Sequence, residues 1–160
     1  MLDSALALTP SNEVLLNNAE QFELARGHLD SARMVVGNAP PSVDRTQFLA
    51  LTVSAWDLYW MLGEEQQRQV LALTPRAFDD DRFVWALGQA EVRAMRGDSV
   101  RSRAYADTAR VVIESRFGGV PTPRYDLTFH ALALAYEGRI SDAAREEQAA
   151  DAQYSATPNL

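Results

Sequence analysis

The chain has 160 residues, a formal net charge of -7 and no cysteine. This length predicts a single domain or a short repeat array, and the lack of cysteine excludes disulfide bonds and thiolate chemistry. Because a nucleic-acid-binding surface needs a basic face to release counterions from phosphates, the acidic balance argues against a nucleic-acid partner.

The sequence carries no signal for a membrane or for export. No apolar run approaches the roughly 18 residues that a transmembrane helix needs. The first residues lack the basic region and apolar core of a signal peptide. We therefore expect no membrane span and favour a cytoplasmic location, with a periplasmic one open if the chain belongs to a longer membrane-anchored protein.

Every basic residue is Arg, which we interpret as the coding bias of a GC-rich bacterial genome.

Helix-forming residues dominate the long segments, and no segment shows the alternating pattern of a β-strand, so we expect an all-α fold. The first expected helix, residues 2–8, closes at Thr9-Pro10. The second begins at Ser11 as its N-cap and runs to about Arg26. A third follows Gly27 and covers residues 29–38. The side chains expected on the buried face of the second helix are Val14, Leu15 and Phe22.

After a break at Pro40-Pro41, one long helix is expected from Asp44 to Leu62, followed by a short helix over residues 64–73. Three aspartates at 79–81 then precede the next helix. Acidic residues at a helix start are favoured by capping and by the helix dipole, so we interpret them as a cap rather than a metal site. The remaining helices are expected over residues 82–96, 98–116, 125–136 and 140–152, with a loop at 117–123.

Glycine-centred turns separate the predicted helices of each pair. The glycines lie at positions 27, 63, 97 and 138, so the steps between them are 36, 34 and 41 residues. A recurring step in the mid-thirties is typical of helical repeat proteins. The pentapeptide Leu-Ala-Leu-Thr-Pro also occurs twice, ending at Pro10 and at Pro75.

With these turns aligned, the chain resembles the tetratricopeptide repeat family, which places small or apolar residues at fixed positions around each turn. The turns at Gly97 and Gly63 match less completely than the other two, and the register between residues 44 and 75 stays open. The matching residues are Ala131, Ile140, Ala143 and Ala150 around Gly138, and Leu29, Ala32 and Ala39 around Gly27.

The resemblance implies a right-handed α-solenoid of about four antiparallel helix hairpins preceded by one leading helix. Short side chains at the hairpin crossings let the helices approach closely, and stacking of neighbours buries the face that one repeat cannot bury alone. Segments 104–110 and 134–139 also resemble repeat arrays of bacterial signalling proteins, including serine/threonine kinases and adenylate cyclase-like regulators. The expected domain is 1–153, with hairpins at 11–39, 44–74, 79–116 and 124–152 and a frayed tail at 154–160.

Other candidate sites have simpler explanations. His28 and His130 have no second histidine or cysteine nearby in the sequence, so we expect no metal site. Gly118-Gly119 precedes a proline rather than a helix start, which argues against a phosphate-binding loop. We expect no catalytic residue, no metal and no cofactor.

A second pattern is a run of arginines spaced by seven residues, Arg96, Arg103 and Arg110. We interpret it as a solvated face with local acid pairs such as Asp107, and keep a basic stripe for an acidic partner as the alternative.

The resemblance implies one candidate site, the inner groove that the first helix of each hairpin lines. Apolar and aromatic anchors there suit a peptide or a helix, although the same residues could simply pack between helices. No groove position carries a positive charge, which argues against a receptor for C-terminal carboxylates. The expected groove residues are Asn17, Gln21, Leu24, Asp57, Trp60, Met61, Glu91, Met95, Tyr125, Thr128, Leu132 and Tyr136, with Val14, Val53, Val84 and Leu87 in the same rows.

These features favour a non-catalytic scaffold or sensor module that binds a protein or peptide within a larger bacterial protein. The alternative is self-association into homodimers through terminal helices that stack end to end. An enzyme would need a convergent cluster of polar side chains, which the sequence does not indicate.

Overall fold

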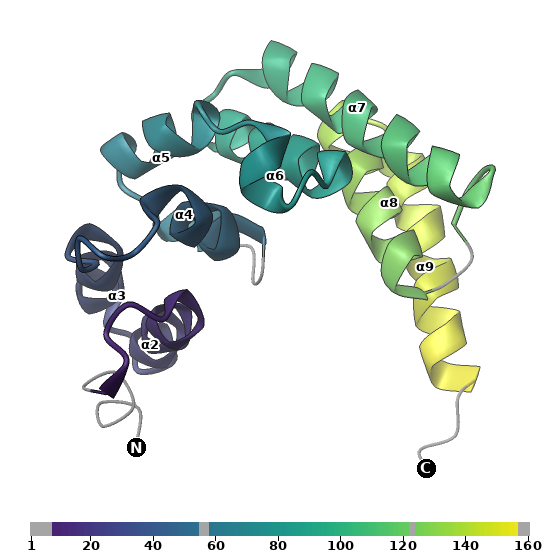
Figure 1. The fold of residues 1–160 in the computed structure, drawn as a ribbon. Coiled ribbons are helices and arrows are strands. Elements are labelled where there is room, and N and C mark those ends of the chain that lie inside the picture. Colours follow the sequence, from purple (N-terminus) through teal and green to yellow (C-terminus); the bar gives the residue numbers. More distant parts are fainter. Residues whose placement is uncertain (1–7, 55–57, 122–123, 157–160) are drawn as a thin grey trace. The chain divides into compact units, whose positions relative to one another are not determined.

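The computed structural model describes residues 8–54, 58–121 and 124–156, and in this part of the chain every regular element is a helix (Figure 1). The expected all-α class is confirmed. For residues 124–125 and 154–156 only the backbone is described. The chain forms two compact units, Met1–Asp80 (unit 1) and Asp81–Leu160 (unit 2), which we treat separately. None of the described helices is both long and apolar enough to cross a lipid bilayer.

Unit 1 is built around α2, which packs against α3 and α4, while α4 packs against α5 and both 3₁₀ turns. Gly27 makes the turn between α2 and α3 with a φ of 77°, a left-handed conformation that glycine adopts without a side-chain clash. The expected helix over residues 2–8 lies outside the described residues apart from its last position. The elements are α2 (Glu13–Ala25), α3 (Leu29–Gly37), α4 (Arg45–Ser54), η1 (Leu58–Met61), α5 (Glu64–Leu71) and η2 (Pro75–Phe78).

The start and the buried face of α2 differ from the prediction. Asn12, not Ser11, caps the helix, because its side-chain oxygen accepts the Leu15 amide hydrogen at 3.0 Å. Val14 and Phe22 are exposed rather than buried. The face that packs is instead partly polar, and this is why the apolar pattern misplaced it. Its buried residues are Leu16, Asn17, Ala19 and Glu20.

The predicted single helix from Asp44 to Leu62 is wrong in its second half. The helix begins at Arg45, close to the expected start, and Asp44 caps it by accepting the amide hydrogens of Thr46 and Gln47. The described part of the helix reaches Ser54, residues 55–57 lie outside the described residues, and Leu58–Met61 form the 3₁₀ turn η1. This turn buries Leu58 and Met61 three residues apart, which suits a helix with three residues per turn. It also leaves the Met61 carbonyl to accept from Arg33 Nε at 2.8 Å.

Unit 2 consists of two helix hairpins that pack in chain order, with α6 also touching α8. Gly97 and Gly138 make the hairpin turns with φ of 78° and 90°. Asp81 caps α6 by accepting the amide hydrogens of Phe83 and Val84, so the interpretation of this aspartate as a cap is confirmed. α9 continues past its expected end at 152. The helices are α6 (Arg82–Met95), α7 (Ser99–Phe117), α8 (Arg124–Glu137) and α9 (Ile140–Ala156).

The helices of unit 2 cross where side chains are short. Ala90 of α6 is fully buried, and Ser102 of α7 donates its hydroxyl hydrogen to the Ala90 carbonyl at 2.8 Å. A side chain can reach a neighbouring helix backbone in this way only when no bulky group intervenes. The crossing aligns two helices over a hydrophobic core, whose fully enclosed members are Phe83, Ala86, Leu87, Ala109, Ile113 and Ala133.

We therefore predict that Ala90→Leu destabilises the protein by about 1–3 kcal/mol through overpacking at this crossing. Urea denaturation monitored by circular dichroism would measure the change. Ala104→Leu is the matched control, since Ala104 lies on an exposed position of α7. Equal stability of the two variants would contradict a close crossing at Ala90.

Candidate functional site

The expected groove residues fall into four classes in the structure: buried, exposed, half-buried and not described. Asn17, Met61 and Glu91 are buried, as are Val53 and Leu87 in the same rows, so these side chains are corrected from surface contacts to interior ones. Asp57 and the side chain of Tyr125 lie outside the described residues. The exposed members are Trp60, Met95 and Val14, and the half-buried ones are Gln21, Leu24, Val84, Thr128, Leu132 and Tyr136.

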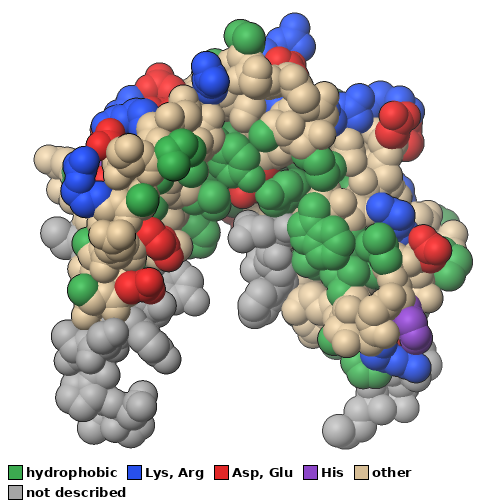
Figure 2. Space-filling model, turned by 180° about the vertical axis from the view of Figure 1, so that it is seen from behind, with side chains coloured by type: hydrophobic (Ala, Val, Ile, Leu, Met, Phe, Trp, Pro, Cys, Tyr) green, Lys and Arg blue, Asp and Glu red, His purple; other side chains and the backbone are tan. Residues whose placement is uncertain are grey.

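Hydrophobic side chains also reach the surface in groups, as the face drawn in Figure 2 shows. Among the predicted residues, the clearest such arrangement is on α8. Thr128, Leu132 and Tyr136 (the α8 stripe) are spaced by four residues and all are half-buried. Side chains four residues apart on a helix are neighbours on one face, so the predicted spacing of these three residues gives one continuous stripe.

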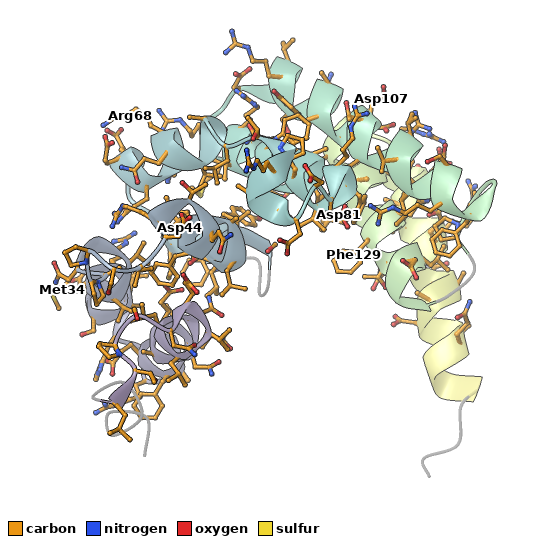
Figure 3. The ribbon with its side chains drawn as sticks, in the orientation of Figure 1. Met34, Asp44, Arg68, Asp81, Asp107 and Phe129 are labelled. Carbon is orange, nitrogen blue, oxygen red and sulfur yellow. The ribbon has the colours of Figure 1, made fainter. Side chains whose placement is uncertain are left out.

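The α8 stripe rests on the core of unit 2. Leu132 and Tyr136 each pack against the enclosed core with one side while remaining partly accessible. Phe129 projects from α8 toward the start of α6 (Figure 3), where its ring meets the Phe83 ring edge-on at a centroid distance of 5.9 Å. The packed residues beneath the α8 stripe restrict the rotamers of the stripe's side chains in the unbound protein.

Asn17 and Gln21 belong to a buried polar cluster between α2 and α4, which we name the Glu20 cluster (Asn17, Glu20, Gln21 and Thr52). Asn17 Nδ2 donates to Glu20 Oε2 at 3.2 Å, and Gln21 Nε2 donates to Asn17 Oδ1 at 2.8 Å. Thr52 Oγ1 lies 3.4 and 3.3 Å from the two carboxyl oxygens of Glu20. Burial raises the pKa of Glu20 to about 8, although the hydrogen bonds with Thr52 and Asn17 act in the opposite direction.

Neither Glu20 nor Thr52 was among the predicted site residues. The available signal was weak: Asn17 and Glu20 lie three residues apart, beside Leu16 and Ala19, and so share a helix face with apolar residues. A polar pair in that position suggests an internal hydrogen bond. The partner Thr52 is 32 positions further on, and no local pattern connects it to α2.

A second buried cluster joins three helices of unit 2. His130 of α8 is 2 % exposed; its Nε2 lies 2.9 Å from Glu114 Oε1 of α7, and its Nδ1 contacts Glu146 of α9. Arg110 extends the cluster, with its Nη1 2.9 Å from Glu114 Oε2 and its Nε 2.6 Å from Glu137 Oε1. We call these five residues the His130 network.

The His130 network joins three carboxyl groups to one guanidinium and one imidazole. A neutral imidazole has one N–H group, so both ring nitrogens can donate to carboxylates only when the ring carries two protons. Burial disfavours the Glu114 carboxylate, but hydrogen bonds from His130 and Arg110 outweigh this effect and hold the pKa of Glu114 below its ordinary value. Because Arg110 and His130 each contact carboxylates of neighbouring helices, the network ties α7, α8 and α9 together.

The remaining predictions concern metals and arginines. Within the described residues, no group of three or more histidine, aspartate or glutamate side chains is placed to hold a metal ion. His28 is instead an exposed partner of Glu23, with Nδ1 3.0 Å from its carboxylate. Arg110 pairs with Asp107 as expected. Arg116 of α7 instead reaches Asp81, the N-cap of α6, which lies 35 positions earlier, with Nη2 2.6 Å from Oδ1.

The comparisons with known proteins provide no relative from which a site could be transferred. The chain matches no protein-family model, and neither the curated proteins nor the solved structures compared with it gave a match. The tetratricopeptide resemblance therefore rests on the sequence pattern, and the function has to be inferred from the chemistry of the chain itself.

The His130 network predicts unequal roles for the two histidines. His130→Ala should lower the free energy of unfolding by about 3 kcal/mol, because Glu114 and Glu146 lose their common donor in a largely buried setting. His28→Ala should change it by less than about 0.5 kcal/mol, as is usual for exposed positions. Urea denaturation of both variants would test this, and similar losses for the two would contradict a stabilising network at His130.

Proposed function

We propose that this chain is a non-catalytic module that binds a protein or peptide through the α8 stripe. The observation that carries the proposal is the row of half-buried Thr128, Leu132 and Tyr136, of which Leu132 and Tyr136 rest on the hydrophobic core of unit 2. Apolar and aromatic side chains that are held in place before binding lose little conformational entropy when a partner docks. Aromatic anchors of this kind contribute a large share of binding energy in known interfaces.

The chemistry of the stripe suits a partner with apolar side chains on one face. Leu132 offers a purely apolar contact, while Tyr136 combines an apolar ring with a polar hydroxyl end. Thr128 adds a small polar end to the row. An amphipathic helix with anchors at positions i, i+3 or i+4, and i+7 has the spacing to match such a row.

The tetratricopeptide-like solenoid belongs to the same proposal. Support comes from the glycine turns with left-handed φ at 27, 97 and 138 and from the close crossing at Ala90 and Ser102. The sequence resemblance places Thr128, Leu132 and Tyr136 in the groove rows of that family. A scaffold or sensor segment of a larger bacterial protein is the setting in which such a module would act.

Selection of peptides from a displayed random library on the full chain, followed by titration calorimetry of the best binder, tests the proposal. We predict that Leu132→Ser weakens the selected peptide at least tenfold, which corresponds to about 1.4 kcal/mol of lost contact. Val111→Ser is the matched control, since Val111 is an exposed residue of α7 outside the stripe. Circular dichroism and thermal unfolding must first show that both variants keep their helix content.

Unchanged affinity of Leu132→Ser, together with unchanged affinity of Tyr136→Ala, would remove the α8 stripe as the binding site. Equal weakening by Leu132→Ser and Val111→Ser would also contradict it, because the effect would then not depend on the position of the residue.

Self-association through α2 is a second candidate, favoured by its exposed face. Val14, Asn18 and Phe22 follow each other at steps of four on this helix, and the two apolar members are 59 % and 53 % exposed. Arg26 covers one edge of this row, with its guanidinium 5.4 Å from the Phe22 ring centre. A second copy of the chain could bury the same row against its own.

Light scattering over a concentration series distinguishes this second candidate. A dimer that disappears in Phe22→Ser, and persists in the control Val111→Ser, is the result that self-association through α2 predicts. A monomer at every concentration, or a dimer that Phe22→Ser leaves intact, would exclude it.

A further inference from the structure

The hydroxyl group of Thr52 has more hydrogen-bond neighbours than one hydrogen can serve. Thr52 Oγ1 lies 3.0 Å from the Phe48 carbonyl oxygen and 3.4 and 3.3 Å from the two oxygens of Glu20. A hydroxyl donates one hydrogen and can accept others. The Phe48 carbonyl can only accept, so the hydrogen in the shortest of these contacts belongs to Thr52.

The remaining contact between Thr52 and Glu20 then needs a hydrogen from the carboxyl side. Glu20 Oε2 already accepts from Asn17 Nδ2 at 3.2 Å, and Asn17 Oδ1 accepts from Gln21. Glu20 Oε1 is thus the oxygen available to carry a proton and to donate it to Thr52 Oγ1. With that one proton, Thr52 Oγ1 donates to the Phe48 carbonyl and accepts from Glu20 Oε1, while the 3.3 Å contact with Glu20 Oε2 is a close approach without a hydrogen of its own.

We propose that Glu20 is a buried neutral carboxylic acid that donates a hydrogen bond to Thr52, and that loss of its proton loosens the packing of α2 on α4. The packing of α2 on α4 in unit 1 should therefore weaken at alkaline pH. This pH dependence is independent of the proposed binding function, because none of the four residues of the Glu20 cluster belongs to the α8 stripe.

The charged groups around Glu20 do not replace the proton. On α3, Asp30 pairs with Arg33, whose Nε donates to the Met61 carbonyl. On α4, Arg45 donates to the Val36 carbonyl and to Gln69. On α2 itself, Glu23 pairs with Arg26 and His28, and Glu13 lies in the first helical turn. Among the residues that the structure describes, which leave out Asp3 and Asp57, none of these charged groups contacts the Glu20 carboxyl.

An ionised Glu20 would therefore be a buried charge without a counterion, which is costly in a protein interior. Glu20 is 0 % exposed. Its pKa of about 8, raised mainly by burial from the ordinary 4.5, agrees with the hydrogen-bond count.

The pH dependence of stability follows from this difference. Between pH 4.5 and about 8 the folded state keeps the Glu20 proton while the unfolded state has released it. Stability from this group is complete below pH 4.5, falls as the pH rises through that window, and levels off above about pH 8. One retained proton changes the unfolding equilibrium constant by about tenfold per pH unit at most.

Urea denaturation of the full chain across this pH window tests the proposal with two variants. Glu20→Gln supplies an amide that can donate to Thr52 without titrating, so it should fold and should lose the wild-type decline of about tenfold per pH unit. Glu64→Gln removes a carboxylate whose side chain is 82 % exposed, and should keep that decline. Parallel pH profiles for the wild type and Glu20→Gln would overturn the proposal.

NMR of the glutamate carboxyl groups detects this proton directly. It distinguishes a protonated Glu20 from a Glu20 that has only a structural role. In protein labelled with ¹³C at the glutamate carboxyl carbons, one resonance should titrate near pH 8, and that resonance should be missing in Glu20→Gln. Hydrogen exchange of α2 and α4 amides should also rise above this pH in the wild type relative to Glu20→Gln at the same pH. A Glu20 resonance that titrates at its ordinary 4.5, or amide exchange equal in the two proteins, would overturn the proposal.

Discussion

The close approach of α6 and α7 at short side chains is the constraint on which unit 2 depends. Ser102 reaches the carbonyl of Ala90 directly, so the two helices have little freedom to slide past each other. Their register then brings Phe83 and Leu87 of α6 against Ile113 of α7. α8 completes this core, and its outer side carries the half-exposed residues that we propose as a binding surface. The surface is thus a consequence of how the hairpin beneath it packs.

Both units place carboxyl groups between helices, but they stabilise them differently. In unit 1, Glu20 has only neutral hydrogen-bond partners, and the lowest-cost form of such a group is the uncharged acid. In unit 2, Glu114 and Glu137 have the Arg110 guanidinium beside them, and Glu114 and Glu146 contact the His130 ring. Buried pairs of this kind contribute modestly to net stability, yet losing one partner is costly. Each cluster therefore favours the observed register of its helices over a register in which one helix is shifted along its axis.

Local chemistry explains which features of the fold were predictable from the sequence. Asp81 caps α6, and Gly97 and Gly138 adopt left-handed turns, because these roles depend on a few adjacent residues. The four-residue spacing of the α8 stripe was likewise visible. The 3₁₀ turn η1 and the burial of Asn17 were not, since they involve partners distant in the chain. Arg33 contacts the backbone of η1, and Thr52 satisfies Glu20 across a helix interface. The spacing of apolar residues along the sequence does not indicate such polar contacts.

The most direct test of the proposed binding role is to map a selected peptide onto the chain by chemical-shift changes in NMR spectra. The account predicts that the largest changes fall on the amides and side chains of Thr128, Leu132 and Tyr136, with smaller ones on Phe129. Changes concentrated on α2, around Val14 and Phe22, would contradict it and would place the interaction surface on unit 1.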